Sequence, residues 1–176
     1  RRTFHVPRAW SELAVRIEFE AVFHTATAQV NGKPAGMHVG KGYTAFSLDV
    51  SPLLLYGVDN TIEVKVDNAF NEAMLPRGKS SDWAHDGGIY RPVQLLVTPK
   101  VFFERLEVDA DPDLTNKTAS IAIRAVVRNT SRNPWQGRIG YRIDDEATGN
   151  PVHQQPDAAG VTLAGGESKT IELQRC

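Results

Sequence analysis

Residues 13–20 read LAVRIEFE, with bulky apolar side chains at the odd positions and mostly polar ones at the even positions. Successive side chains of a β-strand point to opposite faces, so this stretch predicts a strand with one buried and one exposed face. Residues 62–67 and 93–97 repeat the pattern, and Pro92 stands where a strand can begin without losing a ladder hydrogen bond. Long helical periodicity is missing, so the sequence predicts an all-β chain.

Turn residues connect these predicted strands. Asn31-Gly32 separates residues 27–30 from residues 33–35, and Asn-Gly readily takes the positive φ angles of a type I′ hairpin turn. Residues 51–57, SPLLLYG, predict one short helical turn, with Ser51 as its cap and Gly57 at its end. This is the only helix that we expect.

A domain boundary is expected at residues 98–100, and alternation continues beyond it at residues 121–128 and 139–143. Turn-rich stretches separate the later strands, at residues 111–113, 129–134, 147–151 and 164–166. Short strands at this spacing favour an antiparallel sandwich. The prediction is therefore two β domains in series, residues 1–98 and 99–176.

The charge and composition exclude several classes of protein. Twenty Lys and Arg face 21 Asp and Glu, for a net charge of -1, and no basic face is evident for nucleic acid. No apolar run approaches the roughly 20 residues that cross a bilayer, so no membrane partner is expected. The single cysteine, Cys176, excludes an intrachain disulfide and a cysteine zinc site, and leaves the compartment open. Sugars are neutral and fit this balance.

The least strand-like stretch is residues 68–90, a connection too long to be structureless without a function. Asp82 and Trp83 stand there side by side, with His85 close behind. Carboxylates accept hydrogen bonds from vicinal hydroxyls, and an indole stacks on the apolar face of a pyranose, so this pair has sugar-site chemistry. The alternative is that Trp83 fills the core and Asp82 caps a turn. Asp82 and Asp86 alone do not make a glycosidase pair, so no catalytic residue is predicted.

Neither a metal nor another cofactor is expected. Asp109, Asp111 and Asp113 resemble the start of a calcium loop, but Leu114 and Ser120 stand where that loop needs Gly and Glu. A solvated turn is the better interpretation. The histidines are scattered, and we expect most of them to be ordinary surface or hydrogen-bonded residues.

Eight short strings, taken in order, form a family signature. They are residues 2–7 (RTFHVP), 19–22 (FEAV), 29–33 (QVNGK), 36–46 (GMHVGKGYTAF), 66–68 (VDN), 75–78 (LPRG), 82–83 (DW) and 87–91 (GGIYR). As an ordered set they resemble the N-terminal sugar-binding domain of glycoside hydrolase family 2, which includes β-galactosidases, β-glucuronidases and β-mannosidases. The resemblance covers residues 1 to about 98.

The resemblance implies a jelly-roll, galactose-binding-like sandwich for residues 1–98 and an immunoglobulin-like sandwich for residues 99–176. The family's third domain is a TIM barrel that carries both catalytic glutamates, and this sequence contains none of it. By the family's pattern, the aspartate at position 82 reaches into the barrel's active site and hydrogen-bonds hydroxyls of the non-reducing sugar. Trp83 and His85 share that stretch and are expected to line the same pocket.

Family members begin some tens of residues earlier and finish the second domain with a further strand, so the resemblance implies that both domains are truncated. We therefore expect the non-catalytic N-terminal region of a family 2 β-glycosidase, inactive alone, whose partners are a terminal β-linked sugar and the barrel of the same protein. The alternatives are a stand-alone carbohydrate-binding module and a structural pair of β-sandwiches.

Overall fold

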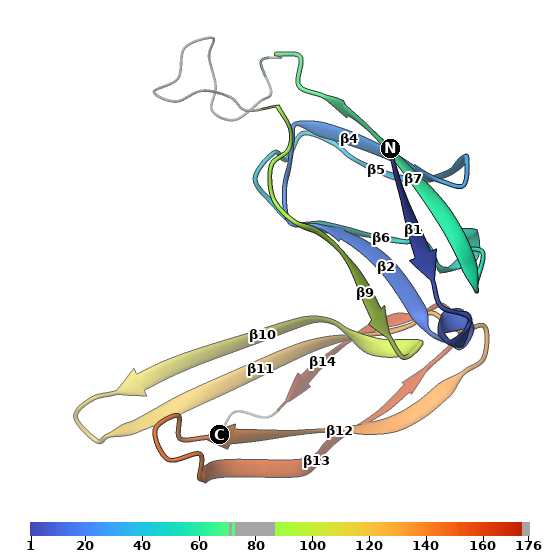
Figure 1. Cartoon of the computed structure of the whole chain (residues 1–176). Coiled ribbons are helices and arrows are strands. Elements are labelled where there is room, and N and C mark those ends of the chain that lie inside the picture. Colours follow the sequence, from blue (N-terminus) through green and yellow to red (C-terminus); the bar gives the residue numbers. More distant parts are fainter. Residues whose placement is uncertain (71, 73–86, 174–176) are drawn as a thin grey trace. The chain divides into compact units, whose positions relative to one another are not determined.

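The computed structural model describes residues 1–70, 72 and 87–173 (Figure 1). The chain forms two compact units, Arg1–Pro99 and Lys100–Cys176, which we call unit 1 and unit 2 and describe separately. Both units are built from antiparallel strands, so the all-β prediction is confirmed. The helices of the described residues are short 3-10 segments, and none has the length and apolar character needed to cross a membrane.

Unit 1 contains two main sheets and one short strand pair. The first sheet has the order β1-β7-β4-β5, the second β6-β2-β9, and β3 pairs with β8. The strands are β1 (Arg2–Val6), β2 (Ala14–Phe19), β3 (Val22–Phe23), β4 (Thr25–Val30), β5 (Lys33–His38), β6 (Phe46–Asp49), β7 (Val58–Asp67), β8 (Gly88–Ile89) and β9 (Val93–Thr98).

The predicted alternation of residues 13–20 places the core of unit 1. Val15, Ile17 and Phe19 of β2 are at most 3% exposed, while Arg16 and Glu18 between them keep partial access to solvent. Buried residues of both sheets pack against these side chains, so unit 1 is a β-sandwich. The full buried cluster is Val6, Val15, Ile17, Phe19, Val22, Ala26, Val30, Val50 and Leu54.

The hairpin between β4 and β5 confirms the predicted Asn-Gly turn. Asn31 has a φ of 52° and Gly32 a φ of 75°, the left-handed values that a type I′ turn requires. The side chain of Asn31 then donates to the carbonyl of Leu53 (3.0 Å) and to Oδ1 of Asn60 (2.7 Å). The turn is thereby fixed to the start of β7.

The helix prediction was partly wrong. A 3-10 turn forms at Ser51–Leu53, but Ser51 lies inside it, and its hydroxyl hydrogen-bonds the carbonyl of Val15 rather than capping the turn. A second 3-10 helix, Arg8–Glu12, was not expected. It follows Pro7, whose carbonyl accepts from the amide of Trp10, and so short a segment shows no helical periodicity in the sequence.

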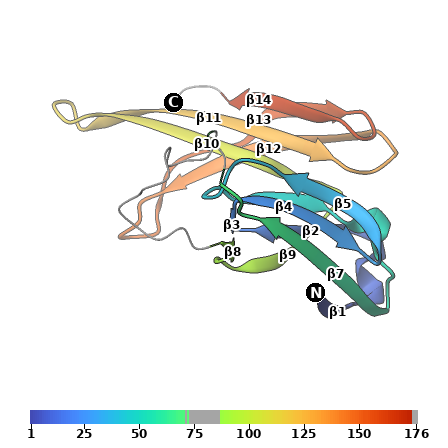
Figure 2. The same cartoon turned by 90° about the horizontal axis from the view of Figure 1, so that it is seen from above.

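Unit 2 is also a sandwich, built from the sheets β10-β11-β14 and β12-β13. Its strands are β10 (Val101–Asp113), β11 (Thr118–Asn129), β12 (Trp135–Asp144), β13 (Pro151–Leu163) and β14 (Ser168–Leu173). The buried cluster between the sheets is Ile123, Val127, Ile139, Val161, Leu163 and Leu173. Because β14 pairs only with residues 123–128, the β10–β11 hairpin extends well past it (Figures 1 and 2).

The turn predicted at residues 111–113 is wrong, because β10 continues to Asp113 and the chain reverses at residues 114–117. Pro112 is tolerated there because β10 is an edge strand of its sheet. The carboxylate of Asp113 accepts the backbone amides of Thr115 (2.9 Å) and Asn116 (3.0 Å). These bonds, led by the one from Asn116, lower the pKa of Asp113.

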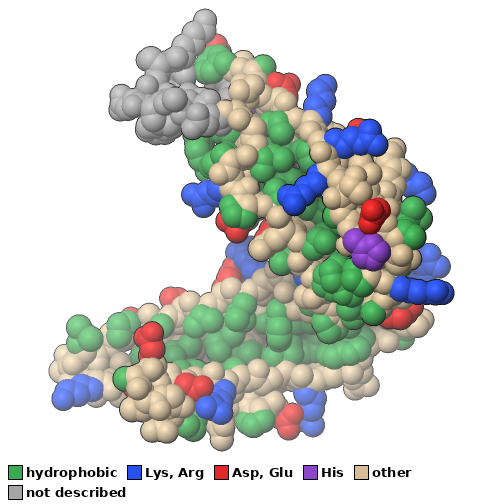
Figure 3. Space-filling view, viewed as in Figure 1, with side chains coloured by type: hydrophobic (Ala, Val, Ile, Leu, Met, Phe, Trp, Pro, Cys, Tyr) green, Lys and Arg blue, Asp and Glu red, His purple; other side chains and the backbone are tan. Residues whose placement is uncertain are grey.

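An apolar groove runs along unit 2 between β10 and β12. Phe103, Leu106 and Val108 pair with the core residues of β11 but remain 56–59% exposed, and they line a groove of about 360 Å³. Hydrophobic side chains form a continuous stripe along this unit in Figure 3. In the described part of the chain, the sheet opposite β10, β11 and β14 has two strands, β12 and β13.

Candidate functional site

The residues predicted for the sugar site, Asp82, Trp83 and His85, lie outside the described residues. The structure describes the chain on either side of them, up to Phe70 and again from Gly87. The candidate site is therefore built from these two flanks and from the described side chains around them.

The two flanks lie in contact. A Cβ atom at Gly87 would overlap the side-chain amide of Asn68, so the returning chain passes directly beside the departing one at this point. Gly88 has a φ of 108° and pairs with Phe23, while Ile89 pairs with Val22 in the short β3–β8 ladder. Directly after Gly87, the returning chain is therefore paired with the buried residues of β3.

Aromatic rings lie around the β3–β8 pair. Phe23 is 2% exposed, and its ring centroid lies 5.5 Å from that of Tyr43, with the planes tilted by 55°. A Cβ atom at Gly42 would overlap the ring of Phe23, so the backbone before Tyr43 packs directly on that ring. The hydroxyl of Tyr90 donates to the carbonyl of Gly42 (2.7 Å) and links this loop to the residue after β8.

Three stacked rings lie at the ends of the same loop, which joins β5 to β6 at residues 39–45. Phe19 stacks on Phe46 at 4.8 Å, and Phe46 stacks on His38 at 4.0 Å, with interplanar angles of 10° and 9°. Nε2 of His38 lies 3.2 Å from the carbonyl of Lys41, so the imidazole donates across the loop. Burial lowers the pKa of His38 from its ordinary value, and the hydrogen bond to Lys41 partly opposes this.

His24 is a buried histidine that is hydrogen-bonded through one of its two ring nitrogens. It is 4% exposed, and Nδ1 lies 3.4 Å from the hydroxyl of Thr25. Nε2 is buried and has no hydrogen-bond partner in the described part of the chain. Its ring centroid is 5.5 Å from that of Phe23, so an unsatisfied polar atom lies beside the aromatic cluster.

This arrangement brings apolar ring faces and hydrogen-bonding groups together on unit 1. Exposed rings offer flat apolar faces, and phenol and imidazole groups offer hydrogen bonds. Among residues 1–70, 72 and 87–173, no group of three His, Cys, Asp or Glu side chains could hold a metal ion. In the sequence Tyr43 stands out only as part of the string at residues 36–46, because the contacts that fix its side chain join residues far apart in the chain.

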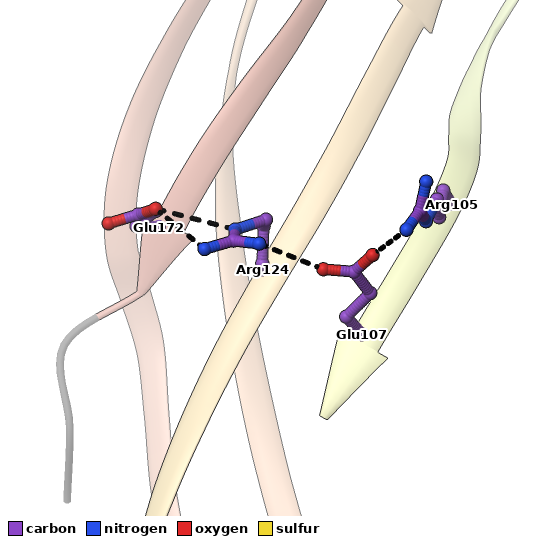
Figure 4. A network of polar contacts seen from close by, with 4 residues as sticks. All are labelled: Arg105, Glu107, Arg124 and Glu172. Atoms are coloured by element: carbon purple, nitrogen blue, oxygen red, sulfur yellow. Dashed lines mark hydrogen bonds and ion pairs between the residues drawn. The ribbon is translucent and has the colours of Figure 1, made fainter. Parts of the chain in front are cut away.

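Unit 2 carries a different polar feature on the outer face of its three-stranded sheet (Figure 4). Arg124 lies 3.1 Å from Glu107 and 3.3 Å from Glu172, and Glu107 also pairs with Arg105. Arg124 and Glu172 are more than half exposed, and such pairs contribute about 1 kcal/mol or less. A cavity of about 710 Å³ opens beside the network where β14 ends, and its lining mixes both charges with apolar side chains. Nothing in this mixture favours a particular ligand.

The comparisons with known proteins point to one family. The model of "Glycosyl hydrolases family 2, sugar binding domain" matches residues 1–99. A beta-galactosidase of Thermoanaerobacter pseudethanolicus is 33% identical over 128 residues, which are 72% of this chain and 17% of the relative. A beta-glucuronidase of Bacteroides fragilis is 29% identical over 106 residues, 60% of this chain and 15% of the relative.

A solved structure gives the same result. The crystal structure of Bacteroides uniformis beta-glucuronidase superimposes with a TM-score of 0.81 and 28% identity, covering 99% of this chain and 21% of that one. The chain therefore spans about a fifth or less of the length of these relatives.

Proposed function

Because the chain belongs to family 2 of the glycosyl hydrolases through its sugar-binding domain at residues 1–99, we propose that it serves as the N-terminal, non-catalytic region of a β-glycosidase. Residues 1–98 act as a jelly-roll domain and residues 99–176 as an immunoglobulin-like domain. The reaction is retaining hydrolysis of a terminal β-glycosidic bond, and its two carboxylates belong to a barrel domain of the same protein.

The contribution of this chain to the reaction is orientation. Asp82 accepts hydrogen bonds from hydroxyls of the terminal sugar, and Trp83 and His85 line the same subsite. Holding the sugar in a reactive geometry lowers the entropic part of the barrier. The barrel is thus a partner of the chain, and a terminal β-linked sugar is its ligand.

The observation that carries this proposal is the family match over residues 1–99. The role of Asp82 is part of the proposal and comes from the resemblance of residues 82–91 to the family's pattern. The contact between Asn68 and Gly87 supports it, because both flanks of the stretch that carries Asp82 are held at one place on unit 1. A β-galactoside is the first substrate to test, since the relative with 33% identity is a beta-galactosidase, and a β-glucuronide is the second.

The experiment replaces Asp82 by Asn in the glycosidase that carries this chain, with Asp86→Asn as the matched control on the same stretch. Loss of a charged hydrogen bond costs about 1.5–3 kcal/mol, so kcat/KM should fall about 10- to 100-fold in Asp82→Asn. The control should stay within about threefold. An unchanged kcat/KM in a folded Asp82→Asn protein would refute the proposal.

Calorimetry on the 176-residue chain tests the proposal from the other side. Methyl β-galactoside and methyl β-glucuronide should bind weakly or not at all, because the barrel supplies most of the pocket. Micromolar affinity would instead identify a stand-alone carbohydrate-binding module. No binding, together with no effect of Asp82→Asn on the glycosidase, would identify a structural pair of β-sandwiches.

A further inference from the structure

We propose that Asn116 of unit 2 is an acceptor site for N-linked glycosylation. The sequence contains the Asn-X-Ser/Thr motif twice, at residues 116–118 (NKT) and at residues 129–131 (NTS). Enzymes that recognise this motif attach a sugar to the side-chain amide of its asparagine, so the amide must be accessible to them. The proposal concerns unit 2 and does not rest on the proposed function.

The first motif lies at the end of the β10–β11 hairpin. Residues 114–117 form the turn, and Thr118, which supplies the hydroxyl of the motif, begins β11 opposite Asp113. All residues from 111 to 120 are exposed, and Leu114 in the turn is 85% exposed. Asn116 and Thr118 are therefore presented together on the described surface of unit 2.

This end of the hairpin has few supports. Because β14 pairs with residues 123–128 of β11, residues 118–122 pair with β10 alone in the described part of the chain (Figures 1 and 2). A hairpin of two strands is only marginally stable by itself, so this end can open locally when an enzyme binds it. Nδ2 of Asn116 donates to Oδ2 of Asp113 (2.7 Å), but both side chains are exposed and water competes for the bond.

The second motif differs in burial and in hydrogen bonding. Asn129 is 0% exposed, and its Nδ2 donates to the carbonyls of Asn133 (2.9 Å) and Ala164 (3.0 Å). A side-chain amide nitrogen carries two protons, so both protons of Asn129 are engaged. The hydroxyl of Ser131, the third residue of this motif, lies 2.7 Å from Oδ1 of Asn129. The folded chain therefore presents the amide of Asn116 and withholds that of Asn129.

The modification is a glycosyl transfer from a nucleoside diphosphate sugar. Nδ2 of Asn116 attacks the anomeric carbon of the sugar and forms a C–N bond. The C–O bond to the diphosphate breaks, and the nucleoside diphosphate leaves with the electron pair. One amide proton passes to a base of the transferase. No oxidant or reductant is needed.

Glucosylation of the 176-residue chain tests the proposal. The reagents are a soluble N-glycosyltransferase that recognises Asn-X-Ser/Thr and UDP-glucose as the donor, and peptide mass spectrometry locates the sugar. Asn116 should be modified at least about tenfold faster than Asn129, because the amide of Asn129 is reached only when unit 2 opens. Thr118→Val keeps the shape of the threonine but removes the hydroxyl of the motif, so it should abolish modification of Asn116.

Synthetic peptides of residues 110–122 and 124–136 provide the control. Neither peptide is folded into unit 2, so the transferase should modify both motifs at similar rates. The contrast between Asn116 and Asn129 in the chain then comes from the fold and not from the residues of the two motifs.

Three outcomes would overturn the proposal. An Asn116 that stays unmodified in the chain would show that the hairpin does not present its amide. Equal rates at Asn116 and Asn129 in the chain would show that burial gives no selection between the motifs. Modification of Asn116 that persists in Thr118→Val would show that the motif is not what the enzyme recognises.

Discussion

Replacing Asn60 by Ala should destabilise unit 1 without affecting unit 2. Asn60 is 1% exposed at the start of β7, and its side chain makes four hydrogen bonds. Oδ1 accepts from Nδ2 of Asn31 (2.7 Å) and from the amide of Leu55 (2.8 Å). Nδ2 donates to the carbonyls of Leu55 (2.8 Å) and Val58 (3.1 Å). One side chain thus joins the β4–β5 turn, the residues after the 3-10 turn and β7.

The magnitude follows from these four bonds. Each contributes about 1 kcal/mol net, but the side chain of Asn31 keeps its bond to Leu53, so that it is not left without a partner. We therefore expect the free energy of unfolding of unit 1 to fall by about 3 kcal/mol. With a typical urea dependence of about 1–3 kcal/mol per M, the midpoint moves by about 1–3 M.

Asn129 provides the matched control in unit 2. It is 0% exposed and also makes four side-chain hydrogen bonds, two to the carbonyls of Asn133 and Ala164 and two from Ser131. Hydrogen exchange measured by mass spectrometry separates the units. Asn60→Ala should speed exchange in β4 and β7, and Asn129→Ala in β11 and β14. A loss below about 1 kcal/mol, or equal acceleration in both units from either variant, would refute the reasoning.

Two further predictions concern the loop that carries Tyr43. Tyr90→Phe removes the 2.7 Å hydrogen bond to Gly42 and should speed amide exchange at residues 40–44 about fivefold, with exchange in the β4–β5 hairpin unchanged as the control. The lowered pKa of His38 means that the unfolded chain binds a proton more readily. Stability from neutral His38 is therefore complete above about pH 6.5 and is lost as pH falls through the lowered pKa of the folded state. Thermal melts at pH 7.5 and 5 should show a larger drop for the natural protein than for His38→Phe, which keeps a ring beside Phe46. Equal drops would contradict this.

The sequence predicted those parts of the fold that depend on neighbours along the chain. The alternation in residues 14–19 and the positive φ of Asn31 and Gly32 are local properties, and both appear in the structure. Strand ends were harder, because Pro112 and Pro156 interrupt a strand pattern in the sequence. Both lie in edge strands, where the absent N–H need not remove a ladder bond. Whether a strand tolerates proline depends on its place in the sheet, and the order of strands in a sheet cannot be read from neighbouring residues.

The candidate site was less predictable for a similar reason. Asp82 and Trp83 attracted attention through their chemistry, without any contact to place them. Tyr43, Phe23 and Tyr90 come together through pairs separated by about 20 and 48 residues, so no motif in a short window reveals them. The burial of His24 likewise follows from the packing around β3 and not from its neighbours in the sequence.

The hydrogen bonds of Asn31 also affect the rate at which this side chain deamidates. Asparagine is a thermolabile residue, because the next backbone nitrogen can attack its side-chain carbonyl and expel ammonia, and the small glycine that follows Asn31 leaves this attack unhindered. In the folded chain that amide is held by Leu53 and Asn60, and its oxygen accepts the amide of Thr61 (3.0 Å), so the side chain is not free to rotate into the attacking geometry. Unfolding removes all three restraints. Deamidation at position 31, which adds one negative charge, should therefore be faster in molecules whose unit 1 has unfolded than in folded ones.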